Sequence, residues 1–252
     1  MAASVDSLFV HSSVKGSGQT IIFVHGWTCD ESSWDAQLPV LAKDYRVVSL
    51  DLPGHGKSEG PASVEGYSMR LFADAVEAVR AEIGADKVVL VGHSMGALVI
   101  RAYALKYPDR VAGLVAVDGR LDQREWTKID NPEVQMTREL RESLIKRMFV
   151  EKTSSELTER IRAMMMSASS ITAQGAYDAM SDPANQSDKI IDAPALTVWA
   201  AQSFPDPEFE TRDMIPSWEE IRLEGTGHFL MMEQPNIFNE ILAQFIVNRA
   251  QF

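Results

Sequence analysis

The stretch of sequence that decides the fold is Val88-Val89-Leu90-Val91-Gly92-His93-Ser94-Met95-Gly96. Its first four residues are apolar and three of them are β-branched, which predicts a short, fully buried strand. The strand runs directly into a Gly-x-Ser-x-Gly pattern, and residues 97–107 are expected to form a helix. A serine on such a sharp turn has its hydroxyl thrust out of the sheet, and the flanking glycines leave room for the strained backbone. The stretch therefore predicts a nucleophile elbow with Ser94 at its tip.

Ser94 has a second interpretation, because Gly-x-Ser-x-Gly is a loose pattern and serine is also a common N-cap of helices. The buried strand before Ser94 and the helix after it favour the catalytic interpretation, since the motif requires this context. The N-terminus of that helix also adds oriented N–H groups where an oxyanion would form. We therefore expect Ser94 to be a nucleophile.

Length and composition favour one α/β domain that acts on a small molecule. The chain has 252 residues, 45% hydrophobic content, a net charge of −12 and a single cysteine, Cys29. An acidic chain is a poor candidate for binding nucleic acid or an anionic membrane, so neither partner is expected. One cysteine excludes an internal disulfide and gives no metal cluster. With no signal peptide or membrane span expected, we predict a cytoplasmic protein, either a monomer or a dimer.

Buried strands alternate with helices along the chain, which predicts an α/β fold: a mostly parallel central sheet with helices on both faces. Besides the strand before Ser94, strands are expected within 7–15 and at 20–24, 45–50, 111–117, 195–200 and 218–223. Helices are expected at 31–41, 67–83, 97–107 and 236–249. Residues 122–188 are helical, polar and rich in methionine. We interpret them as a helical cap inserted after the sixth strand, which leaves 1–121 and 189–252 as the core.

Four stretches carry a resemblance to a known family: His25-Gly26-Trp27, Asp51-Leu52-Pro53-Gly54-His55-Gly56-Lys57-Ser58, Gly92-His93-Ser94-Met95-Gly96 and Gly225-Thr226-Gly227-His228-Phe229. Each is weak alone, but their order and spacing together are specific. The chain resembles the α/β-hydrolase fold superfamily over essentially its whole length, and most of all its small, capped serine esterases and lactonases. The resemblance implies a Ser–acid–His triad and no cofactor. A serine on the elbow argues against the family's epoxide hydrolases and haloalkane dehalogenases, which carry an aspartate there.

His228 is the expected general base. It is the only histidine after Ser94, so the order of triad residues in the superfamily leaves no other candidate. A neutral imidazole near pH 7 takes the serine proton and returns it to the leaving group. The oxyanion hole is expected from two backbone N–H groups, those of Met95 and of Trp27, which lies in the turn that the resemblance matches.

The triad acid has two candidates. The family usually carries it just beyond the strand that is 195–200 here, where Asp206 would serve if the loop before it bulges. Some relatives carry it one strand earlier, at the carboxyl end, and that residue here is Asp118. The other interpretation of Asp118 is a turn aspartate that bonds nearby amides. Because a triad is recognised by geometry rather than by sequence position, we favour Asp118 and keep Asp206 as the alternative.

The predicted substrate pocket includes His25, Gly26, His93, Trp126 and Met231. The two histidines are expected to make structural hydrogen bonds rather than to ionise in catalysis. Methionines in 122–188 suit a permissive pocket, although buried helix faces explain them equally well. Asp51 precedes a glycine-rich loop, and its carboxylate is expected to accept hydrogen bonds from the amides of that loop.

Three functions agree with these features. The first is hydrolysis of carboxylic esters or lactones of small, fairly apolar substrates through an acyl-enzyme. The second is hydrolysis of a C–C bond in a ring-cleavage product, for which Arg124, Arg138 and Arg141 offer basic side chains. The third is a ligand receptor that keeps the pocket and turns over slowly.

Overall fold

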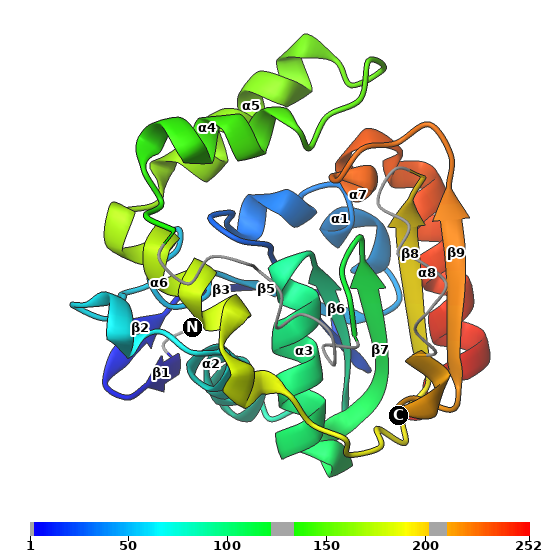
Figure 1. Cartoon of the computed structure of the whole chain (residues 1–252). Helices are drawn as coiled ribbons and strands as arrows, with labels where there is room; N and C mark the ends of the chain where they lie inside the picture. The colour runs from blue at the N-terminus through cyan, green and yellow to red at the C-terminus, as the bar shows by residue number, and fades with distance from the viewer. Residues whose placement is uncertain (1–2, 122–133, 202–210) are drawn as a thin grey trace.

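The computed structural model describes residues 3–121, 134–201 and 211–252, and a seven-stranded sheet forms its centre (Figure 1). The strands lie in the order β3-β5-β4-β6-β7-β8-β9. β3 runs antiparallel to β5, and the other neighbouring pairs are parallel. The mostly parallel sheet predicted from the sequence is thus confirmed. The seven strands are Ser12–Lys15 (β3), Thr20–Val24 (β4), Arg46–Leu50 (β5), Val88–His93 (β6), Val111–Val117 (β7), Ala195–Ala200 (β8) and Trp218–Leu223 (β9).

The N-terminal segment contains more strands than the single one expected within 7–15. Ala3–Val5 (β1) and Leu8–Val10 (β2) pair as a separate antiparallel hairpin, and β3 joins the main sheet. Asp6 and Ser7 form the turn between β1 and β2, both with positive φ, a backbone conformation without a clear signature in this sequence. Counted with β1 and β2, the strand that precedes the helical segment is the seventh in the chain, whereas the sequence places the cap after the sixth.

The central strands are buried on both faces and end at the same level. Every residue of β4, β6, β7 and β8 is buried, as expected for parallel strands covered on both sides. Val24 of β4 pairs with Gly92 of β6, and Val117 of β7 pairs with both His93 and Val198. The loops after these strands therefore meet at one edge of the sheet, where ligands of open α/β sheets bind.

Helices cover both faces of the sheet (Figure 1). Met69–Glu82 (α2) and Met95–Lys106 (α3) pack together on one face, while Leu38–Leu41 (α1) and Pro235–Arg249 (α8) pack on the other. Ser68 caps α2 by accepting the N–H of Leu71 at 3.0 Å. The expected helix over 31–41 is instead a 3₁₀ turn, Glu31–Trp34 (η1), followed by α1. Pro39 explains the break, because it lacks the N–H that a continuous helix would need.

A helical segment between β7 and β8 lies beyond the carboxyl ends of the strands. In Figure 1 the arrowheads of β7, β8 and β9 point toward this side of the molecule. We call its described part, residues 134–188, the insertion. It contains Arg138–Lys146 (α4), Ser155–Ser167 (α5) and Ser170–Ser181 (α6). Thr137, Ser154 and Ser169 cap these helices through their side-chain oxygens, contacts worth about 1 kcal/mol each. The first part of the predicted cap, 122–133, lies outside the described residues.

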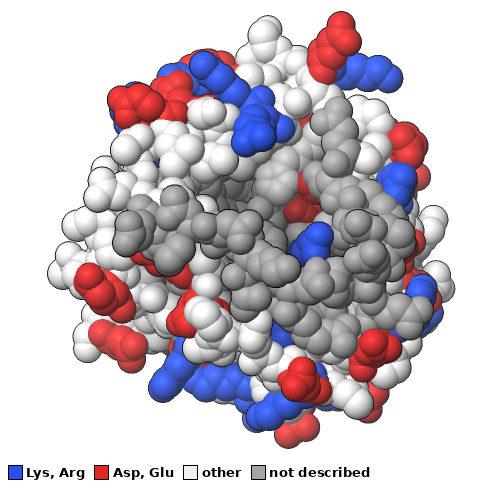
Figure 2. All heavy atoms as spheres, viewed as in Figure 1, with Lys and Arg blue, Asp and Glu red and all other residues white. Residues whose placement is uncertain are grey.

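On the face shown in Figure 2, acidic and basic side chains are interspersed around the perimeter, and the described residues form no broad basic patch there. Among the described helices, none combines the length and the apolar character that a membrane crossing requires.

Candidate active site

Ser94 lies on a strained turn between β6 and α3. Its φ of 51° and ψ of −114° are rare for a residue with a side chain. A Cβ atom on Gly92 would lie 2.3 Å from the carbonyl oxygen of Gly96, and one on Gly96 would lie 2.4 Å from that of Val24. The turn therefore requires glycine on both sides of the serine. Although Ser94 occupies the N-cap position of α3, its hydroxyl makes no capping bond, contrary to the second interpretation of this residue.

His228 and Asp118 are joined by a short hydrogen bond. The Nδ1 atom of His228, in the loop after β9, lies 2.5 Å from Oδ2 of Asp118, which directly follows β7. The other carboxylate oxygen accepts the N–H of Ala200 at 2.8 Å, and the side chain of Asp118 is fully buried. Both carboxylate oxygens therefore have fixed donors, and the ring of His228 is held in one orientation. The alternative acid, Asp206, lies outside the described residues.

Ser94 and His228 line the same small cavity of about 10 Å³, the space that one water molecule needs. The other described lining residues are Trp27, Cys29, His93, Met148, Met165 and Phe229. The wall therefore combines the polar groups of Ser94, His93 and His228 with aromatic and sulfur-containing side chains. Its two methionines come from the insertion and belong to the group that the sequence associates with a permissive pocket. No motif marks Cys29, and Phe229 ends the motif around His228 without being predicted to line the cavity.

The turn after β4 packs directly against the elbow. A Cβ atom on Gly26 would lie 2.8 Å from Nδ1 of His93 and 3.3 Å from Cβ of Ser94. In the part of the chain that the structure describes, the backbone N–H groups of Trp27 and Met95 have no hydrogen-bond acceptor. Within the described residues, no acceptor thus competes for the two N–H groups of the predicted oxyanion hole. The indole N–H of Trp27 is already used, since Nε1–H donates to the Ala173 carbonyl of α6 at 2.9 Å.

The buried histidines near the site act as neutral hydrogen-bonding groups. His25 bonds the Gly26 carbonyl through Nδ1 at 2.8 Å and accepts the Leu52 N–H at Nε2 at 3.0 Å. The ring of His93 bonds the His228 carbonyl through Nε2 at 2.8 Å and lies 4.7 Å from the His228 ring. Burial lowers the pKa of both histidines, and that of His93 falls well below its usual value, so both rings stay neutral near pH 7.

The remaining predicted pocket residues have different surroundings. Of the predicted set, His93 lines the cavity and Gly26 lies against Ser94. Met231 is fully buried in the short helix Leu230–Glu233 (α7), where its carbonyl accepts Nε2 of Gln37 at 3.0 Å. Trp126 lies outside the described residues. The pocket wall around the substrate therefore stays a prediction for these last two positions.

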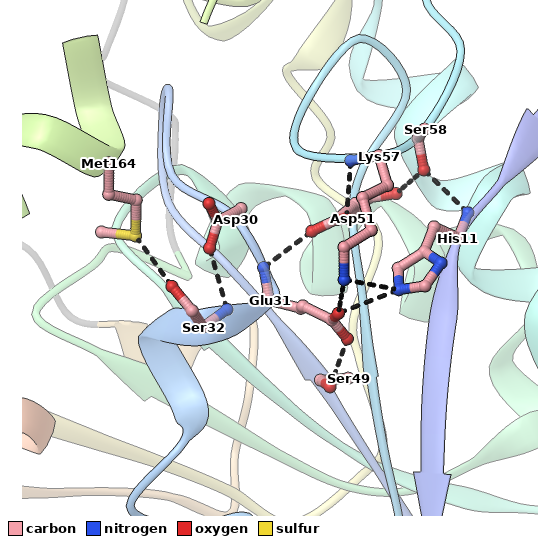
Figure 3. A network of polar contacts seen from close by, with 9 residues as sticks. All are labelled: His11, Asp30, Glu31, Ser32, Ser49, Asp51, Lys57, Ser58 and Met164. Atoms are coloured by element: carbon pink, nitrogen blue, oxygen red, sulfur yellow. Dashed lines mark hydrogen bonds and ion pairs between the residues drawn. The ribbon is translucent and has the colours of Figure 1, made fainter. Parts of the chain in front are cut away.

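A polar cluster at the β3 edge of the sheet brings together ligand atoms of His11, Glu31 and Asp51 (Figure 3). A lysine ammonium already lies among them, because Lys57 Nζ is 3.0 Å from Oε1 of Glu31 and 3.4 Å from Nε2 of His11. Burial raises the pKa of Glu31, but hydrogen bonds from Ser13, Lys57 and His11 outweigh it and lower this pKa to about 2. The cluster is thus a network of charged hydrogen bonds centred on the carboxylate of Glu31.

Asp51 has the role in this cluster that the sequence predicts. Its carboxylate accepts the N–H of Glu31 at 2.7 Å and that of Lys57 at 2.9 Å, which fixes the glycine-rich loop 51–58. A Cβ atom on Gly56 would lie 2.3 Å from this carboxylate, so the loop packs closely around it.

Known proteins of the same fold include several hydrolases. The family described as alpha/beta hydrolase fold matches residues 19–235. A thermophilic esterase from Thermogutta terrifontis superposes with a TM-score of 0.81 at 25% identity, covering 99% of this chain and 98% of the other. Est816, described as an N-acyl homoserine lactone degrading enzyme, does so with a TM-score of 0.78 at 25% identity, covering 97% and 100%.

A curated relative is the pimeloyl-[acyl-carrier protein] methyl ester esterase of Aeromonas hydrophila, 37% identical over 102 residues, which are 40% of this chain and 38% of that protein. Several other curated relatives, epoxide hydrolases among them, are matched over only 20% to 36% of their own length. The family match is far more extensive and spans most of the sequence. The chain therefore belongs to the alpha/beta hydrolase fold family.

Proposed function

We propose that this protein is a serine hydrolase that cleaves carboxylic esters or lactones of small, fairly apolar substrates through an acyl-enzyme. The observation that carries the proposal is the cavity shared by Ser94 and His228, together with the bond from His228 to the buried carboxylate of Asp118. The names of the esterase and lactone-degrading relatives support the same substrate classes. The serine at the elbow, where epoxide hydrolases of the superfamily carry an aspartate, supports acyl transfer over epoxide opening.

The hydrogen bonds of His228 suit the first step of this chemistry. A carboxylate only accepts, so the imidazole proton lies on Nδ1 and Nε2 is left with a lone pair. In the proposed reaction Ser94 Oγ attacks the carbonyl carbon of the substrate while Nε2 of His228 takes the hydroxyl proton. The resulting imidazolium is stabilised by Asp118.

The tetrahedral intermediate carries its negative charge on the former carbonyl oxygen. In the proposed mechanism the N–H groups of Trp27 and Met95 bind this oxygen; one such donor is worth about 10²- to 10³-fold in kcat. The intermediate then collapses, and the alcohol leaves with the proton from His228. Water attacks the acyl-enzyme, His228 takes its proton and passes it to Ser94 Oγ, and the carboxylic acid leaves.

The insertion supports the preference for apolar substrates. Met148 and Met165 line the cavity from this side, and Trp27 and Phe229 line it from the core. Thioether and aromatic side chains adapt to apolar groups of different shape. We propose that the insertion, with residues 122–133, caps the site.

The test combines a covalent probe with a substrate panel. We expect a fluorophosphonate to label the wild-type protein and not the Ser94→Ala variant. Short p-nitrophenyl esters and aliphatic lactones should be turned over by the wild type alone. Labelling together with ligand-dependent melting shifts but negligible turnover would identify a receptor. Turnover of a vinylogous diketone alone would identify a C–C hydrolase. Either result would contradict the proposed ester or lactone activity.

A further inference from the structure

The loop that carries His228 runs in close contact with residues 148–153 of the insertion. The backbone N–H of His228 donates to the Met148 carbonyl at 2.8 Å. A Cβ atom on Gly227 would lie only 2.6 Å from this same carbonyl oxygen, so the two backbones approach as closely as a glycine allows. The base is thus bound to the insertion by its main chain, in addition to its bond to Asp118.

Glu233, the last residue of α7, connects the two segments a second time. Its Oε2 accepts the Gly227 N–H at 2.9 Å and lies 3.2 Å from the hydroxyl of Thr153. That hydroxyl oxygen accepts the N–H of Val150 at 3.1 Å, which leaves its proton for the carboxylate. One carboxylate oxygen therefore joins the residue before the base to the insertion.

The two connections bind backbone N–H groups of the His228 loop that residues of the sheet do not contact. From the strand ends of the sheet, Asp118 binds Nδ1 of His228 and His93 binds the backbone carbonyl of His228. The insertion supplies the acceptor for the backbone N–H, and Glu233 fixes the neighbouring peptide. Hydrogen bonds to an ionised carboxylate are roughly twice as strong as neutral ones, so the Glu233 contact is the firmer part of this second support.

We propose that Glu233 is a positioning residue that ties the His228 loop to the Met148–Thr153 segment of the insertion. The imidazole takes its working position when this segment is docked, so movement of the insertion is coupled to the base itself as well as to access to the cavity. This inference rests on the proposed hydrolase function for its effect on turnover. The tie itself does not depend on that function.

Substitution of Thr153 tests the tie without altering Glu233 or its bond to Gly227, because Thr153 contacts Glu233 from the insertion. Thr153→Val keeps the shape and removes the hydroxyl, while the matched control Thr153→Ser keeps the hydroxyl. Hydrogen exchange of residues 224–229 should be faster in the valine variant and unchanged in the serine variant. We expect the valine variant to lower kcat for a p-nitrophenyl ester by about 5- to 10-fold, with KM within about 2-fold because substrate contacts remain.

Glu233→Leu removes both bonds to the carboxylate and should exceed the effect of Thr153→Val on both measurements. Equal exchange in the valine and serine variants would overturn the tie. Faster exchange with an unchanged kcat would overturn the positioning role. If the wild-type protein hydrolyses no ester or lactone, the proposed function fails, and the exchange comparison alone then supports or overturns the tie.

Discussion

The Nδ1 atom of His228 lies 2.5 Å from Oδ2 of Asp118, although 110 residues separate them in the sequence. The carboxylate directly follows β7, and its second oxygen is bound by the N–H of Ala200 at the end of the neighbouring strand β8. Asp118 has a φ of 44°, in the left-handed region that residues with a side chain rarely adopt, and two hydrogen bonds hold its carboxylate there. The strain is therefore stored at the residue that orients the imidazole.

The Asp118→Asn variant tests the role of this carboxylate. An amide cannot hold the imidazole in the tautomer with the proton on Nδ1, so kcat should fall by roughly 10³- to 10⁴-fold with little change in KM. Steady-state kinetics with a p-nitrophenyl ester measure the change, and Asp206→Asn is the matched control. Near-normal turnover in Asp118→Asn with a large loss in Asp206→Asn would transfer the role to Asp206.

Gly119→Ala tests how closely the segment after β7 must approach the elbow. The added Cβ would lie 2.7 Å from both the Ser94 carbonyl oxygen and the Cβ of Ala97, which forces the backbone of the elbow to shift. We expect a loss of about 1 to 3 kcal/mol in the free energy of unfolding, as for other overpacked sites, together with a lower kcat. Urea unfolding and kinetics measure both. Gly113→Ala is the control, because its Cβ would meet no atom closer than the ring edge of Phe245 at 3.1 Å, with the Pro194 carbonyl oxygen at 3.5 Å. Equal losses in the two variants would contradict the prediction.

Trp27→Phe separates the main-chain role of this residue from that of its indole. The variant keeps the N–H proposed for the oxyanion hole and removes the Nε1–H bond to the Ala173 carbonyl. The lost bond should lower the free energy of unfolding by about 1 kcal/mol, while kcat stays within roughly 10-fold of the wild type, less than the loss of an oxyanion donor. A loss of 10³-fold in the kinetic measurement would mean that the indole itself contacts the reacting groups.

His55→Gln tests the contribution of buried histidines to acid sensitivity. Burial, followed by the neighbouring His25, lowers the pKa of His55 to about 3. The folded state thus binds fewer protons than the unfolded state between about pH 6.5 and 3, so stability falls as the pH falls through this window. Removing the group should reduce the slope by about 1.4 kcal/mol per pH unit within it. Urea unfolding at several pH values measures the slope, and identical slopes for the two proteins would contradict the assignment.

Much of the fold could be predicted because its strands are short, apolar and bounded by glycine motifs. The strand before Ser94 and its neighbours at 20–24 and 111–117 are buried throughout, so tertiary packing agrees with local preference. The N-terminal hairpin was missed because its turn uses positive φ at Asp6 and Ser7, where no glycine marks it. Residues 31–41 form two short helices rather than one, because Pro39 lacks the N–H that a continuous helix would need despite the helical pattern of the sequence.

Some residues of the candidate site could be predicted from the sequence, and others could not. Ser94, His228 and Asp118 lie in recognisable loops after strands, and the structure brings the last two into contact. Glu233 and Thr153 have no such signal, because their roles depend on two segments 80 residues apart that meet only in the folded protein. Cys29 also lines the cavity without a signal in the sequence. Burial raises the pKa of its thiol, which stays uncharged. A sequence pattern records local chemistry, whereas these contacts depend on tertiary structure.

The positions of Ser94, Asp118 and the Trp27 turn follow three adjacent central strands, whereas His228 is carried by a loop beyond the edge strand β9. On gentle warming, release of the insertion would remove part of the support of this loop before the sheet melts, since local opening requires less free energy than global unfolding. Heat inactivation would then begin as a reversible loss of the base from an otherwise intact molecule. Activity would return on cooling without refolding, and stabilising the core alone would leave the temperature of inactivation unchanged.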